Sequence, residues 1–600
     1  MDSVNGPEAG NALSWDDHVI GDWYPQATTP LTFSFARKMV ASHYRNLLRA
    51  FGARDEALFQ CREDLHSLLG RIDGHLYYNL ASLKAVMDQV PPITDKDAVI
   101  NELFGELAKE LSSQEKDDSP AVLGYLKSLW GKSTHQVRSL YKIFGSNSSA
   151  TCHQGDFKKK YQQYRALDFA ELSLPELLRI YRQLEQQVEQ WRMPAKTEYC
   201  LKLGYSQLLK MVRDKKHTNP QRLVASLLVG EKLESLEPIK IISHIAQKIS
   251  EDKKLSLFVE EASIDELVAW WAEQAAPYEL EREMGRLFYL YGERRPNEFE
   301  LATASLKEEP RLLFGIIKRY LAQDKLPDMT KRRQLALDRR KRAEKEVRAL
   351  FGSSRSHWAV REITIFEWLL QKTRSNIFAR DEQRLSLARL NGLVGDVFRA
   401  IGCKLEEKNI IAAADCFYLS IDEILDFVEG RALTTNISAL ASIRRDEFEE
   451  YPEKNLKGRL NTFGMIYGKE WQEGLDGKET EDEQEEPVLE IAAQGDSMKG
   501  ARGTVLRVTA EGNGWLSADD ILIARRADPG LTYFYPTVKA LVVERGTALS
   551  HAVVIGREFG IPVLWGAKRA HNLKSGDSVE VDGANGLLRL IESDEPNGSK

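Results

Sequence analysis

An acidic stretch near residue 480 divides this 600-residue chain into two parts with different folding patterns. Residues 477–487 read GKETEDEQEEP, so six of the eleven are acidic and none is large and apolar. Charge repulsion and the lack of core residues predict a flexible, extended linker over residues 471–487. A chain of this length is expected to form about three to five domains.

The part before the linker has the pattern of helices. Apolar residues recur at helical spacing and glycine is sparse, as in the stripe Val360, Ile363, Phe366 and Leu369. We therefore predict a disordered N-terminus over residues 1–14 and a helical region over 15–470, with room for two subdomains. The charged helix 331–348 fits a solvated face with i,i+4 ion pairs better than a nucleic-acid patch.

The part after the linker has the pattern of short strands. Turn residues separate β-rich runs, and one apolar helix is expected at 552–559. The runs are 505–510, 520–526, 539–544, 561–566, 578–583 and 587–592. The fold class is therefore multidomain, with a large, mostly helical region followed by a small α/β domain over 488–592 and a disordered tail over 593–600.

Composition excludes several classes of protein. The formal net charge is −7, which provides no global basic field for nucleic acid or an anionic membrane. No apolar run approaches the roughly 18 residues that span a bilayer, and the N-terminus lacks the pattern of a signal peptide. The five cysteines are scattered without a CxxC pair, so we expect free thiols, no metal site and a cytoplasmic location.

The most informative run is residues 544–566, ERGTALSHAVVIGREFGIPVLWG. A strand is expected to end at its start, and a turn of small residues then leads to Ser550 and His551. Ser550 is a candidate N-cap and Gly560 fits the position just after the helix. His551 is thus predicted at a helix N-terminus, where free amides and the helix dipole favour an anion by roughly 0.3–1 kcal/mol.

That position suits an imidazole that carries a phosphoryl group. Neutral histidine can attack phosphorus, and the phosphate that results needs hydrogen-bond donors. The helix amides, Thr547, Ser550 and Arg557 are the candidate donors. A histidine that only caps or packs at a helix start is the alternative interpretation of the same residue.

The run also resembles a known motif, the phosphohistidine segment of the mobile domain in phosphoenolpyruvate-utilising enzymes. That pattern is Gly-Gly-x-x-Ser/Thr-His-Ala, followed by Ala-Arg-Glu-x-Gly-Ile-Pro. Residues 546, 550–552, 557–558 and 560–562 match it, whereas Thr547 and Gly556 replace a Gly and an Ala. The resemblance implies a three-layer β/β/α swivelling domain with His551 as the phosphorylated residue.

The helical part resembles phosphoenolpyruvate-synthase-like proteins, including the substrate-binding region of rifampin phosphotransferases. The segments that carry this resemblance occur in the expected order: 21–35, 68–80, 227–238, 289–301, 361–362 and 415–424. Glu293 and Thr197-Glu198 differ from the residues usual at these positions in that group, so the identity of the phosphoryl acceptor stays open.

The resemblance also implies a phosphoryl donor. Such enzymes charge the histidine with an ATP-grasp domain, and the sequence shows neither a glycine-rich phosphate loop nor such a domain before its helical part. We therefore expect ATP and Mg²⁺ to bind a separate ATP-grasp protein, no cofactor on this chain, and a dikinase-type transfer to a small-molecule acceptor. A non-catalytic binding or regulatory protein with a vestigial histidine domain is the alternative, and charging by phosphoenolpyruvate is less expected because no barrel for it is found.

Four residues of the helical part are candidates for binding the acceptor. Tyr78 belongs to an aromatic run that we assign to an apolar helix, where core packing is the competing role. Arg294 and Glu298 follow a helix break at Gly292 and could bind an anion or pair with each other. Arg361 fits a pocket residue and a structural ion pair equally well.

Overall fold

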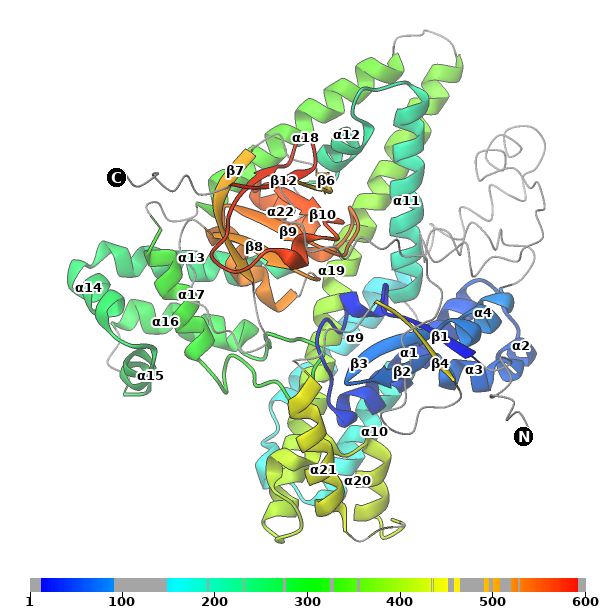
Figure 1. Ribbon diagram of the computed structural model, residues 1–600, viewed down its shortest axis with the longest axis vertical. Coiled ribbons are helices and arrows are strands. Elements are labelled where there is room, and N and C mark those ends of the chain that lie inside the picture. Colours follow the sequence, from blue (N-terminus) through cyan, green and yellow to red (C-terminus); the bar gives the residue numbers. More distant parts are fainter. Residues whose placement is uncertain are drawn as a thin grey trace, which may run out of the picture. The chain divides into compact units, whose positions relative to one another are not determined.

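In the computed structural model (Figure 1), the chain forms two compact units. Unit 1 comprises 1–202, 299–302 and 393–485, and unit 2 comprises 203–298, 303–392 and 486–600. The structure describes residues 12–90, 148–190, 194–229, 233–273, 277–323, 328–352, 357–432, 434, 436–451, 458–463, 490–495, 500–507, 520–526 and 529–591. The predicted linker and tail lie outside these residues, so the predicted domain limits stay predictions.

Unit 1 contains a four-stranded antiparallel sheet that the helical prediction omitted. Its order is β2-β3-β1-β4, with β1 at Ala12–Asp16, β2 at Leu69–Ile72, β3 at His75–Asn79 and β4 at Arg459–Phe463. Residues 12–14, which we had assigned to a disordered terminus, are therefore part of a strand. The buried face of this sheet carries Trp15, Ile72, Tyr77 and Leu460.

A two-residue turn explains why β2 and β3 form a hairpin. Asp73 and Gly74 connect the strands and have φ angles of 43° and 79°. Positive φ at both central positions defines the type I′ turn, for which Asp-Gly is a favoured sequence. Tyr78 therefore lies in a strand, and its assignment to an apolar helix was wrong.

Helices make up the rest of the described part of unit 1. They are α1 (Pro30–Ala50), α2 (Asp55–Gln60), α3 (Arg62–Ser67), α4 (Leu80–Asp88), α9 (Ser148–Arg165), α10 (Leu174–Gln190), α20 (Ile421–Val428) and α21 (Ile437–Glu450), together with the first part of α11 (Pro194–Asp214) and the last part of α19 (His357–Glu406). The large helical share confirms the predicted class of this region.

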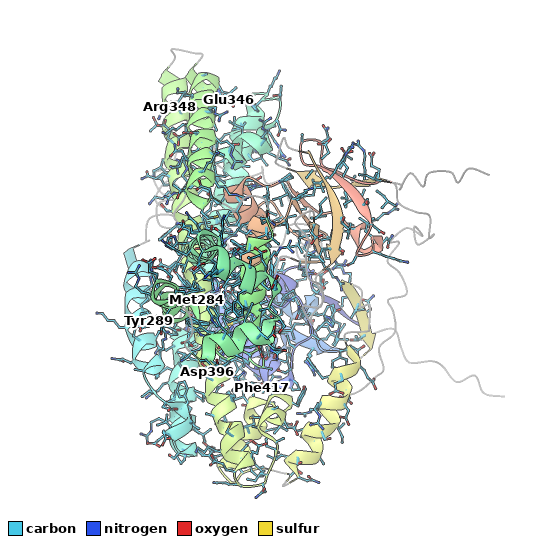
Figure 2. The ribbon with its side chains drawn as sticks, turned by 90° about the vertical axis from the view of Figure 1, so that its left-hand side faces the viewer. Met284, Tyr289, Glu346, Arg348, Asp396 and Phe417 are labelled. Carbon is cyan, nitrogen blue, oxygen red and sulfur yellow. The ribbon has the colours of Figure 1, made fainter. Side chains whose placement is uncertain are left out.

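Unit 2 combines helices with the α/β domain at the end of the chain. Its further helices are α12 (Pro220–Leu227), α13 (Glu237–Glu251), α14 (Lys253–Glu261), α15 (Ile264–Ala272), α16 (Tyr278–Tyr291), α17 (Arg311–Leu321), α18 (Met329–Gly352) and the preceding part of α19. Helices α18 and α19 form a long hairpin. Near the end where the two helices connect, the ring of Phe351 packs against that of Phe366, and Arg348 forms an ion pair with Glu367. Figure 2 marks this end of the hairpin by Glu346 and Arg348.

The α/β domain confirms the strands and the helix expected from the sequence. Eight strands form one sheet in the order β5-β12-β11-β7-β8-β9-β10-β6. They are β5 (Glu490–Ala492), β6 (Gln494–Gly495), β7 (Gly500–Arg507), β8 (Asp520–Ala524), β9 (Ala540–Val543), β10 (Val563–Trp565), β11 (Ser578–Asp582) and β12 (Leu587–Leu590). Strands β7 to β10 are parallel to one another and the flanking pairs are antiparallel.

The centre of this sheet is apolar on both faces. Every residue of β9 and β10 is buried, as expected for parallel strands that are covered on both sides. The connection from β9 to β10 contains helix α22 (His551–Phe559), which ends at Gly560 with a φ of 66°. Gly560 thus takes the left-handed conformation predicted for the residue after this helix.

Among the described residues, none of the helices is both long enough and apolar enough to cross a bilayer.

Candidate functional site

The turn before α22 places His551 at the first position of the helix. Thr547 Oγ1 accepts a hydrogen bond from the amide of Leu549 at 3.3 Å, and Ser550 Oγ accepts one from the amide of Thr547 at 2.8 Å. Ser550 is the N-cap residue as predicted, but its side chain bonds backward into the turn and caps no amide of the helix. The hydroxyl of Ser550 therefore fixes the shape of the turn, while the first amides of α22 keep their hydrogens for another acceptor.

The imidazole of His551 is half-buried and faces a polar neighbour. Its Nε2 lies 3.4 Å from Oγ1 of Thr532, a buried residue of the 3₁₀ segment Pro529–Thr537. Burial beneath a purely apolar layer would have argued against transfer chemistry at this ring. The contact with Thr532 and the partial exposure of the residue show a polar surrounding.

Burial and three arginines hold the pKa of His551 well below its usual range. Loss of hydration is the largest cause, followed by the positive charges of Arg384, Arg380 and Arg294 in that order. Both effects disfavour the protonated ring. His551 is therefore neutral near pH 7, and a neutral imidazole has a nitrogen lone pair that can attack phosphorus.

The three arginines come from elements far from His551 in the sequence. Arg380 and Arg384 lie one turn apart on α19, so their side chains share one face of that helix. Arg294 lies in the segment that follows α16. All three belong to unit 2, together with His551.

Arg294 and Glu298, both predicted to bind substrate, pair with each other. Arg294 Nη2 donates to Glu298 Oε1, and the two side chains are only 6% and 2% exposed. The Arg294 guanidinium also lies over the ring of Tyr533, 5.5 Å from its centroid. The structure thus brings Arg294 into the surroundings of His551 and makes Glu298 its partner, while a role in substrate binding stays a prediction for both.

Arg557, a predicted phosphate ligand, points back toward the turn. Its Nη1 donates to the carbonyl oxygen of Ala548 at 2.6 Å, and its guanidinium lies 5.3 Å from the centroid of the Trp565 ring. Arg557 is buried. This geometry supports a positioning role, in which Arg557 fixes the turn that carries His551; direct phosphate binding by Arg557 stays a prediction.

A role in substrate binding stays a prediction for the other two candidate residues, Tyr78 and Arg361. Tyr78 belongs to unit 1, where it is buried edge-to-face against Tyr44 at a centroid distance of 5.9 Å. Burial raises the pKa of Tyr78 to about 12. These contacts agree with core packing. Arg361 lies within the bounds of α19, but its side chain lies outside the described residues.

Sequence reasoning missed four residues of the site: Arg380, Arg384, Thr532 and Tyr533. The two arginines show a weak signal, an i,i+4 basic pair in a helix whose neighbouring positions are largely buried. No local pattern marks Thr532 or Tyr533, because they reach His551 and Arg294 only through the folded arrangement. The described residues contain no group of three or more His, Cys, Asp or Glu side chains suited to a metal.

Helices α17 and α18 hold the α/β domain through its backbone carbonyls. Tyr320 Oη donates to the carbonyl of Tyr533 at 3.2 Å, and Gln323 Nε2 donates to that of Thr537 at 3.0 Å. Arg319, at the same end of α17, donates to Thr537 Oγ1. These hydrogen bonds from α17 and the residues just after it therefore fix the segment that carries Thr532.

The C-terminal end of α22 is held in the same way. Arg332 Nη1 donates to the carbonyl of Phe559 at 3.3 Å, and Arg339 Nη2 donates to that of Arg557 at 2.9 Å. Guanidinium groups satisfy the last carbonyls of a helix and complement its negative end. The basic helix predicted to be a solvated face thus contributes Arg332 and Arg339 to the contact with α22.

The fold and the histidine site agree with a family comparison. Residues 516–586 match the family described as "PEP-utilising enzyme, mobile domain", and this range includes His551. Residues 200–381 match the family described as "Rifampicin phosphotransferase fourth domain" and include Arg294 and Arg380. Over these two ranges the chain is therefore similar to the mobile domain of PEP-utilising enzymes and to the fourth domain of rifampicin phosphotransferases.

Curated relatives support the same assignment. The chain is 21% identical over 596 residues to the prodigiosin synthesizing transferase PigC of Serratia marcescens, a match that covers 95% of this chain and 62% of PigC. It is 24% identical over 307 residues to the rifampicin phosphotransferase of Streptomyces sviceus, covering 50% of this chain and 33% of that protein. The uncharacterized phosphotransferase YvkC of Bacillus subtilis is 26% identical over 235 residues, covering 38% and 27%. The chain thus spans less than two thirds of the length of each of these relatives.

Proposed function

We propose that this protein is a phosphotransferase component in which His551 carries a phosphoryl group from a donor to an acceptor. The observation that carries the proposal is the place of His551 at the first position of a helix, with Nε2 3.4 Å from Thr532 Oγ1 and with burial and the charges of Arg384, Arg380 and Arg294 lowering its pKa. The names of the relatives, among them rifampicin phosphotransferase, support the same class of reaction.

The first step forms a bond between nitrogen and phosphorus. A lone pair of the neutral His551 ring attacks the phosphorus of the donor, and the bond from phosphorus to the leaving oxygen breaks with its electron pair. The ring proton on the other nitrogen is then lost to solvent or a base. We propose a separate ATP-grasp protein as the donor site, with ATP and Mg²⁺ bound there, because the resemblance of the motif implies that chemistry.

The second step reverses the roles. An oxygen of the acceptor attacks the phosphorus, the N–P bond breaks with its electron pair returning to the ring, and the proton that the acceptor gives up passes to a ring nitrogen, so that neutral imidazole is restored. The phosphoryl oxygens carry negative charge throughout this step. Arg380, Arg384 and the first amides of α22 can stabilise that charge, because charge-assisted hydrogen bonds are roughly twice as strong as neutral ones.

The two steps use different surroundings for one histidine. In the arrangement that the structure shows, the charges of three arginines of unit 2 act on His551, and we assign this arrangement to the transfer to the acceptor. Visiting the donor requires the α/β domain to leave these contacts, for which residues 471–487 would serve as the tether. A small molecule with a hydroxyl or an acidic group is the proposed acceptor.

A labelling experiment tests the proposal. The full chain is incubated with Mg²⁺, candidate ATP-grasp proteins and ATP labelled at the β or γ phosphorus. We expect acid-labile, base-stable label on the wild type and none on His551→Ala. His217→Ala is the matched control, because His217 bonds to Glu346 at 2.8 Å on the helical hairpin and should leave labelling unchanged. Absence of label with every donor, phosphoenolpyruvate included, would support a binding or regulatory protein instead.

A further inference from the structure

Several buried side chains in unit 2 have polar atoms without a hydrogen-bond partner among the described residues, and three of these side chains lie on elements that pack together. Their unpartnered atoms are Nε and Nη1 of Arg294, Oη of Tyr533, and both Oδ1 and Nδ2 of Asn391. Arg294 is 6% exposed and Asn391 and Tyr533 are each 2% exposed. Burying such groups without partners is unfavourable, so a site that retains five of these atoms is suited to a ligand that supplies the partners.

The structure places these three side chains on elements that pack together. The guanidinium of Arg294 lies over the ring of Tyr533. The helix turn that contains Asn391 packs against the segment around Arg294, because a Cβ at Gly392 would lie 2.4 Å from Nη1 of Arg295. Asn391 follows Arg384 by seven residues, or close to two helical turns, and thus shares its face of α19.

The chemistry of the unpartnered atoms favours an oxyanion. Because Nη2 of Arg294 pairs with Glu298, its Nε–H and Nη1–H groups are left for a ligand. These two groups point to different sides of the guanidinium, so each can donate to a separate acceptor oxygen, and a hydrogen bond from a charged donor to an anionic oxygen is a strong one. Burial raises the pKa of Tyr533 to about 12, so its phenol keeps its proton and donates as well. Asn391 adds two N–H donors and one oxygen that can accept from a hydroxyl.

This set is distinct from the arginines that act most strongly on His551. The charges of Arg384 and Arg380 lower the pKa of His551 more than that of Arg294 does. Because Arg294 is also paired with Glu298, we assign it to a group beside the transferred phosphoryl and assign Arg380 and Arg384 to the phosphoryl itself. Since Glu298 offsets the charge of Arg294, the number of unpartnered N–H and O–H donors contributes more to recognition than net charge does.

We propose that Arg294, Tyr533 and Asn391 form a subsite beside His551 that binds an oxyanion, a carboxylate or a phosphate, carried by the acceptor. This inference rests on the proposed function for its identification of the ligand as the acceptor. It assigns the acceptor to small molecules that carry such a group near the oxygen that receives the phosphoryl. Acceptors without such a group would leave Nε and Nη1 of Arg294 without partners.

Calorimetric titration of the full unphosphorylated chain tests the subsite. Inorganic phosphate and oxalate serve as separate probes, so that the two oxyanion chemistries are told apart. We expect saturable binding of at least one probe, weakened tenfold or more by Arg294→Lys and several-fold by Tyr533→Phe and Asn391→Leu. Arg286→Lys is the matched control, because Arg286 is an exposed arginine of α16 that pairs with Glu283. The affinity of this variant for either probe should equal that of the wild type.

Two results would overturn the subsite. One is the absence of saturable binding for both probes. The other is an affinity in Arg294→Lys and Tyr533→Phe equal to that of the wild type, which would assign the bound anion to Arg380 and Arg384. Labelling of wild-type His551 separates this inference from the proposed function. If His551 is labelled but the chain binds neither anion, the subsite alone is refuted. If anion binding follows the predicted order of variants but His551 is never labelled, the carrier role alone is refuted.

Discussion

At the scale of single residues, the environment of His551 determines its protonation. Burial and the charges of Arg384, Arg380 and Arg294 all favour the neutral ring. The unfolded chain would protonate this histidine below about pH 6.5, whereas the folded chain does so only at lower pH. The unfolded state then binds more protons, so the contribution of His551 to stability falls as pH decreases below that value.

This environment predicts the titration of the ring. In the folded protein labelled with ¹³C-histidine, the NMR signals of His551 should still be those of neutral imidazole at about pH 6, where an ordinary histidine is mostly protonated. Arg384→Met removes the strongest of the three charges and should raise the pKa of His551. An ordinary titration near 6.5 in the wild type would contradict the assigned surroundings.

A second residue-scale prediction concerns Gly556, where the related motif has Ala. A Cβ at Gly556 would lie 2.4 Å from Cγ2 of Val563, a stiff β-branched side chain in the buried strand β10. Gly556→Ala should therefore destabilise the α/β domain by about 1–3 kcal/mol. Thermal unfolding against the wild type measures the change, and Ala552→Gly on the same helix controls for altered helix propensity. A variant as stable as the wild type would mean that β10 can move away.

At the scale of elements, α18 and α22 form a contact in which side chains meet backbone carbonyls. Arg332 and Arg339 bond to the carbonyls of Phe559 and Arg557 near the C-terminal end of α22. Gly560 permits this approach, because a Cβ there would lie 3.2 Å from Nη2 of Arg339. The N-terminal end of the same helix remains for the chemistry of His551.

Loss of these caps should loosen the contact. Arg332→Ala with Arg339→Ala is expected to increase amide hydrogen exchange at least tenfold in α22, because this helix loses both of its bonds from α18, and less in residues 529–537, which lose only the bond from Arg332 to the carbonyl of Pro536. Arg342→Ala, an exposed arginine of α18, is the matched control and should leave exchange unchanged. Equal protection in the double variant and the wild type would show that other contacts hold the domain.

The elements also show what the sequence could predict. The strands after the linker and helix α22 follow local patterns of apolar residues and turns, and the structure confirms them. The sheet of unit 1 could not be predicted from local patterns, because β1 pairs with β4 across more than 440 residues. The hydrogen bond from Trp15 Nε1 to Thr462 Oγ1 is an example. The dipeptide Asp73-Gly74 is a local signal of the hairpin formed by β2 and β3, and it does not enter the helical prediction for this region.

At the scale of the whole molecule, each compact unit combines distant parts of the chain. The site in unit 2 joins Arg294, α19 and the α/β domain, so local sequence could identify His551 and its turn but could not predict which arginines surround it. Arg294 was a candidate only because charge follows a helix break. Its neighbours Arg380 and Arg384 lie more than 160 residues before His551, a separation that only tertiary structure bridges.

A buried ion pair contributes to the cohesion of unit 2. Arg319 of α17 lies 3.6 Å from Asp520 of β8, and burial lowers the pKa of Arg319 to about 10. Asp520→Asn should destabilise unit 2 by about 3 kcal/mol, because it removes the carboxylate that pairs with the buried guanidinium charge. Arg319→Met combined with Asp520→Asn should recover much of this loss in thermal unfolding. Additive losses in the double variant would contradict the pairing.

The most direct test of the carrier role is mass spectrometry of the intact chain at neutral to alkaline pH after incubation with ATP, Mg²⁺ and an ATP-grasp protein. We predict one added phosphoryl group, located by fragmentation at His551 and transferred away when the acceptor is supplied. A phosphoryl group located at another residue, or a chain that stays unmodified with every donor, would contradict the account.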